Sequence, residues 1–257
     1  MLREQGAEVR RFALDEASEA ARSGAARLVV AGGDGSIGPA AMAAGRAGIP
    51  LAVVPVGTAN DFARAVGVPL DAAAACRLAA RGTETRHLEL AWIGSRPFVN
   101  VASAGLAPVA ARKARRLKRT FGPLAYSFGA LRAGLGARPI RCRVRSGGET
   151  MFDGAAWQVS VAVTGAFGGG ATVDADPRDG ELDVVVIEAG SRARLVAIAY
   201  RLRAGRIRSQ RGVRSWRRPE AEIVTGGETG FNVDGEVVDA ADARFRVEAR
   251  AFEQVVE

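Results

Sequence analysis

An apolar run ends in a glycine-rich turn at residues 29–36, which read VVAGGDGS. The run at residues 27–31 is continuous rather than alternating, which is typical of a strand buried on both faces of a parallel sheet. Glycines let the chain turn sharply after such a strand, and the N–H groups of the turn suit a phosphate. Asp34 adds a carboxylate, which fits beside phosphate when Mg²⁺ accompanies it. Taken alone, the turn has an alternative explanation as a surface loop, and it matches neither the Walker A nor the GxGxxG pattern.

A second unusual stretch follows one strand later. Residues 49–54 form another apolar run, and residues 55–62 then read PVGTANDF. Because the carboxyl ends of parallel strands meet at one edge of a sheet, we expect Thr58, Asn60 and Asp61 beside the glycine turn. Their hydroxyl, amide and carboxylate groups suit phosphate, ribose or a metal ion. The alternative is that Asn60 only caps a helix expected at residues 61–66.

The order of the expected elements predicts an α/β plus β fold. An N-terminal Rossmann-like parallel-sheet domain is expected over residues 1–85, followed by a β-rich, sandwich-like domain over 86–257 whose last residues could return to the first. In the first domain we expect a strand at 7–13, a helix at 15–24, and a helix at 37–47 with Gly38 and Pro39 in its first turn. Strands are expected later at 86–93, 97–102, 140–145, 157–163, 182–187, 220–238 and 243–249. Further helices are expected near 107–119, 123–134 and 191–204.

The composition limits the kinds of chemistry. The 257 residues are 48% apolar, which is enough material for two domains. His87 is the single histidine, and Cys76 and Cys142 form no CxxC pair, which argues against Cys/His metal clusters and Ser-His or Cys-His catalysis. The two cysteines fit a reducing cytosol. No apolar run approaches the ~20 residues of a membrane span, and the start has no signal-peptide pattern. We therefore expect a soluble, cytoplasmic chain.

The positive charge is concentrated in two short segments of the chain. The net charge is +8, yet residues 112–119 carry six cations and residues 201–218 carry eight arginines and no acid. Such runs indicate an anionic partner, which could be a membrane leaflet, nucleic acid or a polyanionic ligand. The alternative is that they are solvated helix faces. Trp216, inside the second run, could lie at a membrane interface or pack on its own domain.

Four motifs together resemble the diacylglycerol kinase catalytic-domain family, which includes bacterial lipid kinases and sphingosine kinases and belongs with NAD kinase-like proteins. These motifs are GGDGS at 32–36, PVGTANDFAR at 55–64, DPRDGELD at 176–183 and DGE at 234–236. The resemblance implies two domains with the nucleotide and the acceptor between them. It also implies ATP-dependent phosphorylation of a lipid hydroxyl, with ATP and Mg²⁺ bound, at the inner face of a membrane.

The resemblance also implies roles for individual residues. Asp234 and Glu236 would lie at the reaction centre, one of them as general base. Asp176, Asp179 and the backbone carbonyl of Glu181 would bind a structural Mg²⁺, although DPRDGELD alone could be a plain Asp-Gly turn. An EF-hand is excluded because the spacing fails. The expected nucleotide-binding residues are Gly32, Gly33, Asp34, Gly35, Ser36, Gly57, Thr58, Asn60 and Asp61.

Two departures from the family pattern affect these expectations. No Asn-Pro-x-Ser-Gly-like loop precedes Ala7, so we expect either a truncated chain or loss of that element, with weaker ATP binding. Ala107 stands where the family usually has an acidic residue, which puts turnover or the usual acceptor in doubt.

The alternatives belong to three classes. They are an NAD kinase or phosphofructokinase, a nonenzymatic lipid- or nucleotide-binding relative, and a nucleic-acid binder, for which no recognisable motif is present. We expect no specific nucleic-acid partner. The acceptor stays open among diacylglycerol, a sphingoid base, phosphatidylglycerol and another alcohol, and a homodimer is the default oligomeric state.

Overall fold

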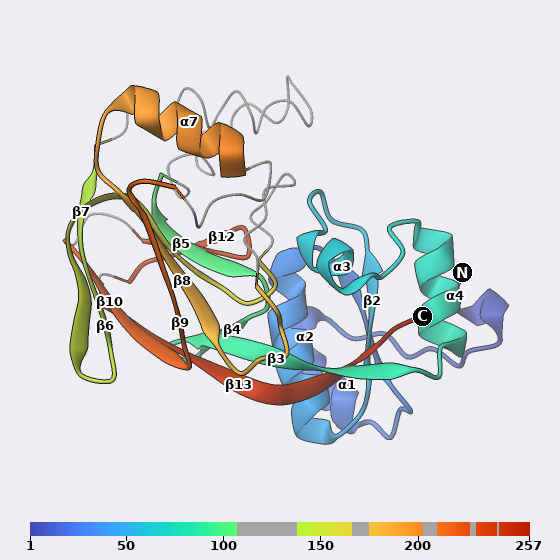
Figure 1. Cartoon of the computed structure of the whole chain (residues 1–257). Coiled ribbons are helices and arrows are strands. Elements are labelled where there is room, and N and C mark those ends of the chain that lie inside the picture. Colours follow the sequence, from blue (N-terminus) through green and yellow to red (C-terminus); the bar gives the residue numbers. More distant parts are fainter. Residues whose placement is uncertain (107–137, 166–174, 203–209, 227–229, 241) are drawn as a thin grey trace.

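The computed structural model describes residues 1–106, 138–165, 175–202, 210–226, 230–240 and 242–257 (Figure 1). An α/β part and a β-rich part lie side by side, and one long strand, β13 (Asp242–Val255), runs beneath both. Some sequence features lie outside the described residues: Ala107, the basic run at 112–119, the helices expected near 107–119 and 123–134, and residues 203–209 of the second basic run.

Two parallel strands form the centre of the α/β part. β1 (Leu28–Gly32) and β2 (Leu51–Pro55) pair in parallel, and α2 (Asp34–Ala47) connects them. β2 is buried at every position because helices cover both of its faces. Its Leu51 and Val53 pack in a cluster with α2 and α3 (Asp61–Val66), whereas Ala52 and Val54 pack against α4 (Ala72–Arg81). The parallel sheet expected from the apolar runs is therefore present.

The first residues differ from the expectation. Residues 7–13 form no strand, because they carry three charged side chains, are largely exposed and offer a sheet no apolar face. The chain continues through short 3₁₀ turns (Arg3–Gln5 and Leu14–Glu16) into α1 (Ala17–Arg22). The helix expected at 37–47 begins three residues earlier, at Asp34, with Gly33 as its N-cap residue. Pro39 consequently lies in the second turn rather than the first.

The β-rich part is built from antiparallel strands around a large apolar core. Phe98, Phe231 and Phe245 belong to this core, and the ring centroid of Phe245 lies 6.3 Å from that of Phe98 and 5.4 Å from that of Phe231. Among the described residues of this part, α7 (Arg192–Leu202) is a helix on the side away from β13 (Figure 1). The strands are β3 (Thr85–Ile93), β4 (Arg96–Phe98), β5 (Val101–Gly105), β6 (Ile140–Ser146), β7 (Glu149–Ala162), β8 (Leu182–Glu188), β9 (Val213–Arg218), β10 (Glu220–Thr225), β11 (Phe231–Val233) and β12 (Glu236–Val238).

Two details of this part correct the sequence analysis. The strand expected at 97–102 is two strands, β4 and β5, separated by a turn at Val99 and Asn100. The end of the second basic run is not a helix face, because residues 213–218 form β9, which pairs with β8. Trp216 of this strand packs against the apolar core of its own domain.

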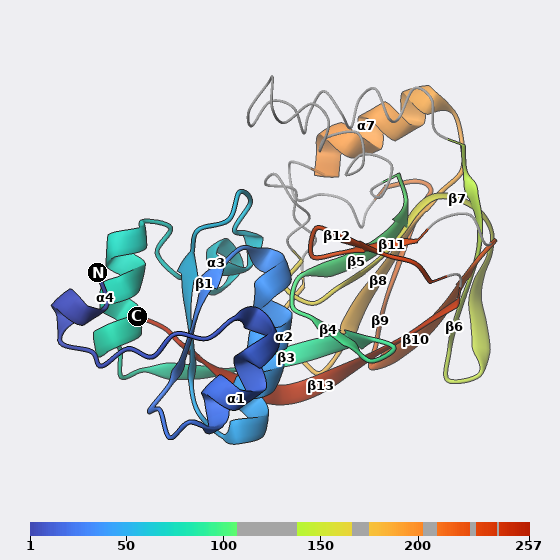
Figure 2. The same ribbon diagram turned by 180° about the vertical axis from the view of Figure 1, so that it is seen from behind.

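β13 joins the two parts, as Figure 2 shows from behind. It pairs with β10 and β3 in the β-rich part, and its Gln254 pairs with Leu51 of β2 in parallel. The pairing with β3 shifts register between Glu248 and Phe252. The last residues therefore lie against the α/β part, while the domain boundary near residue 85 stays a prediction.

α2 packs very closely on the β-rich part. A Cβ atom at Gly45 would lie 2.0 Å from the carbonyl oxygen of Ala251 in β13, and one at Gly38 would lie 2.7 Å from that of Pro97 in β4. Only glycine permits this approach, which fixes the start of α2 relative to β4. Among the described residues, no helix combines the length and the apolar character that crossing a membrane requires.

Candidate active site

The two loops singled out in the sequence touch each other. The backbone N–H of Val56 donates to the carbonyl oxygen of Gly32 across 3.1 Å. A Cβ atom built on Gly57 would lie only 2.5 Å from the Cα atom of Gly33. The glycines at both positions therefore allow the loops to meet at the carboxyl ends of β1 and β2.

Asp34 connects the glycine turn to two other segments. Its Oδ1 atom accepts hydrogen bonds from the backbone N–H of Phe62, at 3.0 Å, and from the side-chain amide of Asn100, at 3.1 Å. Phe62 lies in the first turn of α3, so Asp34 satisfies an N–H group that a helix leaves without a partner in its own turn. Ser36, two residues later, donates its hydroxyl to the carbonyl oxygen of Gly33 across 2.6 Å.

Asn60 lies at the N-cap position of α3, but the alternative in which its side chain caps the helix is wrong. Asn60 precedes α3 in a left-handed conformation with φ of 51°, and its side chain does not cap the helix. Its amide instead binds both backbone groups of Gly57, at 2.9 Å and 3.3 Å, and so closes the second loop. Asp61 is buried and lies 3.9 Å from Arg64, while Thr58 is exposed on the same loop.

Asp234 fastens the late DGE motif to the turn between β4 and β5. Asp234 and Gly235 both have positive φ, as a two-residue Asp-Gly hairpin between β11 and β12 requires. The Asp234 carboxylate accepts three backbone N–H groups at 2.9–3.1 Å, from Val99, Asn100 and Val101. Burial raises the pKa of Asp234 to about 7 and the charge of Asp34 adds to this, while the three N–H groups oppose it.

Glu236 has a different environment from Asp234. Its side chain is exposed, and its Oε1 atom lies against the glycine turn, 2.9 Å from where a Cβ atom on Gly35 would be. Its Oε2 atom forms an ion pair with Arg96 of β4. The DGE motif therefore meets GGDGS in space, with one carboxylate locked by backbone groups and the other accessible.

Asn100 links these parts and was missed in the sequence analysis. It is 2% exposed, its backbone N–H binds Asp234, and its side-chain amide binds Asp34. Its Oδ1 atom accepts the hydroxyl of Thr164 across 2.7 Å. Asparagine between two apolar strands is not distinctive in a sequence, so no local pattern indicates this role.

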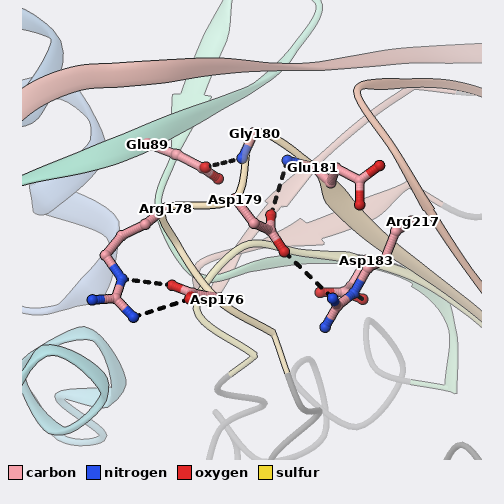
Figure 3. Close-up of polar contacts among 8 residues, drawn as sticks. All are labelled: Glu89, Asp176, Arg178, Asp179, Gly180, Glu181, Asp183 and Arg217. Atoms are coloured by element: carbon pink, nitrogen blue, oxygen red, sulfur yellow. Dashed lines mark hydrogen bonds and ion pairs between the residues drawn. The ribbon is translucent and has the colours of Figure 1, made fainter.

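The DPRDGELD loop forms an acidic cluster beside β3 (Figure 3). Asp176 accepts hydrogen bonds from Nε and Nη2 of Arg178, at 2.7 Å and 3.0 Å, and these contacts lower the pKa of Asp176. Asp179 accepts the backbone N–H of Glu181 at 3.0 Å and lies 3.6 Å from Arg217. Within the described part of the chain, no three acidic, cysteine or histidine side chains are arranged to hold a metal ion. The predicted Mg²⁺ site of Asp176, Asp179 and Glu181 stays a prediction.

Glu89 of β3 also faces this loop. One of its carboxylate oxygens accepts the backbone N–H of Gly180, and the other is buried without a hydrogen-bond partner. Burial raises the pKa of Glu89 to about 7; the Gly180 N–H group opposes the shift, and the charges of Asp179, Asp176 and Asp183 add to it. The acidic side chains of this cluster outnumber its two arginines, Arg178 and Arg217. The excess of negative charge suits a cation.

Replacing Glu89 with glutamine is expected to stabilise the ligand-free protein at pH 8 and to change little near pH 4.5. The wild-type fold retains a proton on Glu89 between its ordinary pKa of 4.5 and about 7, where the unfolded chain has lost it. The free energy of unfolding therefore falls as the pH rises through this window, and Glu89→Gln removes that loss. We expect a gain of roughly 1–3 kcal/mol at pH 8, measured by urea unfolding in EDTA.

The exposed Glu84→Gln is the matched control and is expected to leave stability unchanged at both pH values. Equal destabilisation of Glu89→Gln at pH 4.5 and pH 8 would contradict the raised pKa.

Two family models match the chain. "Diacylglycerol kinase catalytic domain" matches residues 3–92, and "YegS C-terminal NAD kinase beta sandwich-like domain" matches residues 100–256. The chain belongs to the diacylglycerol kinase family. The site described above lies where these two matched regions meet, because Asp34 comes from the first and Asp234 from the second.

Relatives within the diacylglycerol kinase family cover most of the chain. A "Probable lipid kinase YegS-like" protein of Pseudomonas putida is 32% identical over 250 residues, which span 91% of this chain and 78% of the relative. A protein with the same name from Pseudomonas fluorescens is 34% identical over 243 residues, spanning 88% and 76%.

Solved structures share the fold. A diacylglycerol kinase from Bacillus anthracis has a TM-score of 0.75 at 20% identity, over 97% of this chain and 85% of that one. An NAD kinase from Archaeoglobus fulgidus in complex with ATP has a TM-score of 0.52 at 12% identity, over 99% and 86%. The α/β plus β-sandwich architecture expected from the motifs is thereby confirmed.

Proposed function

We propose that this chain is an ATP-dependent lipid kinase that transfers the γ-phosphate of ATP to a lipid hydroxyl. The observation that carries the proposal is the contact between Glu236 and Gly35, which places an accessible carboxylate at the start of the helix that follows the glycine turn. A nucleotide loop and a base are the two parts that a phosphoryl transfer to an alcohol needs from a protein. The family membership and the names of the relatives support a lipid kinase activity.

The two loops suit the phosphates of a nucleotide. Gly33 and Gly57 leave a backbone surface without side chains, and the N-terminus of the 14-residue helix α2 supplies N–H groups and a positive dipole end. Thr58, an exposed residue of the second loop, carries a hydroxyl group. The nucleotide would be held by these groups together with Gly32, Gly35, Ser36, Asn60 and Asp61.

We assign the two carboxylates of the DGE motif different roles. Asp234 positions the turn that follows β4, because both of its oxygens already accept backbone N–H groups. Glu236 is the general base. It takes the proton of the acceptor hydroxyl as that oxygen bonds to the γ-phosphorus, and the bond from phosphorus to the β–γ bridging oxygen breaks to release ADP.

We propose that Mg²⁺ binds at two places in the chain. At the glycine turn, Asp34 would help to hold the ion that accompanies the phosphates, where it would neutralise their charge. At the DPRDGELD loop, Asp176, Asp179 and the carbonyl oxygen of Glu181 would hold a structural ion. The buried, unpartnered oxygen of Glu89 supports a cation there.

The acceptor is proposed to be a lipid at an anionic membrane surface. The net charge of +8 supports this, since each cation near such a surface contributes ~1 kcal/mol of attraction. Arg192 is exposed at the start of α7. Diacylglycerol, a sphingoid base and phosphatidylglycerol are the acceptors to compare.

The proposal is tested by calorimetry with Mg-ATP and by a transfer assay with γ-labelled ATP. Vesicles would contain each of the three acceptors in an anionic lipid background. We expect Mg²⁺-dependent ATP binding and labelled lipid with at least one acceptor. Mg-ATP binding without label in any lipid would favour the nonenzymatic relative, and the absence of both would overturn the proposed function.

A further inference from the structure

Arg96 lies at the edge of the candidate active site on a fixed backbone. β4, which begins at Arg96, pairs with β3 through Arg96 and Ile93. The close approach of Gly38 to Pro97 presses α2 onto the same strand. The position of the Arg96 backbone relative to the glycine turn is therefore set by strand pairing and by helix packing, while its side chain is partly exposed.

Glu236 lies between the guanidinium of Arg96 and the start of α2. The guanidinium binds the Oε2 atom of Glu236, and the other oxygen of the same carboxylate lies against Gly35. One carboxyl group thus separates the cation of Arg96 from the glycine turn. Arg64, which also lies near the loops, donates instead to the carbonyl oxygen of Ala59 in its own segment.

The ion pair between Arg96 and Glu236 is suited to exchange. The two side chains are 37% and 52% exposed, and solvent screening leaves such pairs little net stability. A phosphate offers more charge than a carboxylate and the same two-oxygen geometry, which a guanidinium recognises with two parallel hydrogen bonds. A phosphate arriving at the glycine turn would compete for Arg96 at short range.

We propose that Arg96 binds the terminal phosphates of the nucleotide, exchanging its contact with Glu236 for one with phosphate oxygens. This inference rests on the proposed function. In the ligand-free protein Arg96 holds Glu236, and when ATP is bound it holds phosphate. Glu236 is then free to face the acceptor hydroxyl, so the base becomes available only when the phosphate to be transferred is present.

The test is calorimetric binding of Mg-ATP, Mg-ADP and AMP to the wild type and to Arg96→Gln. We expect Arg96→Gln to weaken ATP binding roughly 10- to 100-fold, because a charge-assisted contact is lost, and to change AMP binding by less than about twofold. Arg96→Lys keeps the positive charge but lacks the planar guanidinium group, and it is expected to retain part of the ATP affinity that Arg96→Gln loses. This comparison separates phosphate recognition from a structural role, which would affect all three nucleotides alike.

Arg145→Gln is the matched control, since Arg145 is also a partly exposed strand arginine with a glutamate partner, Glu222, at 3.9 Å. It is expected to bind all three nucleotides as the wild type does. The inference would be overturned if Arg96→Gln lowered the affinities for ATP and AMP equally, or if the folded variant kept the wild-type affinity for ATP. A wild type that binds no Mg-ATP would instead remove the proposed function, and the two failures are therefore distinguishable.

Discussion

The Glu236→Gln variant is expected to transfer phosphate roughly 10²- to 10⁴-fold more slowly than the wild type. Glutamine keeps the size of the side chain but cannot accept the proton of the acceptor hydroxyl. Because Glu236 is exposed and its contacts are with Gly35 and Arg96, the fold is expected to remain unchanged. Binding of Mg-ATP should be at least as tight as in the wild type, since a negative charge beside the phosphates is removed.

The measurement is a single-turnover transfer assay together with calorimetry of Mg-ATP. Asp234→Asn is the informative comparison, because an amide nitrogen would face one of the three backbone N–H groups that the carboxylate now accepts. That variant is expected to lose roughly 1–3 kcal/mol of stability as well as transfer. Normal transfer by folded Glu236→Gln protein would exclude Glu236 as the base.

The Gly57→Ala variant is expected to separate the two loops. A Cβ atom at this position would lie 2.5 Å from the Cα atom of Gly33, which is backbone and must shift with its loop, and 2.8 Å from the side-chain oxygen of Asn60. We expect a loss of roughly 1–3 kcal/mol in stability from the overpacking. Mg-ATP affinity should fall by about tenfold or more, which corresponds to ~1.4 kcal/mol.

Gly226→Ala is the control for Gly57→Ala. Its added methyl group would meet the Cβ atom of Arg141 at an ordinary 3.7 Å. Urea unfolding and calorimetry of both variants check the prediction. If Gly57→Ala bound Mg-ATP as tightly as Gly226→Ala does, the contact between the loops would be irrelevant to nucleotide binding.

Features that depend on neighbouring residues could be predicted from the sequence. β2 is recognisable because five apolar residues in a row, buried on both faces, leave a continuous pattern. The glycine turn and the PVGTAN loop meet as expected, since both follow parallel strands. The strand expected at 7–13 is wrong because this short segment carries three charges and offers no continuous apolar face for a sheet.

Features that depend on distant contacts could not be predicted from local pattern. Asp234 binds the N–H of Val99, which is 135 residues away in the chain, and this contact interrupts what looks like a single strand at 97–102. The roles proposed for Asn100 and Arg96 arise from the same long-range arrangement. β9 was missed because the arginines at 213–218 resemble a solvated helix face, whereas in the fold Arg217 pairs with Asp183 of the adjacent strand.

The position of β13 has a consequence for the order of folding. It follows every other described strand in the sequence, yet in the sheet it lies between β2 and β10 and also pairs with β3. During synthesis the α/β half therefore emerges before the strand that later lies beside β2. The non-local pairing of β13 makes folding slow compared with a protein of local contacts. Until that strand arrives, the apolar surface that Phe252 later covers stays open to chaperones and to aggregation.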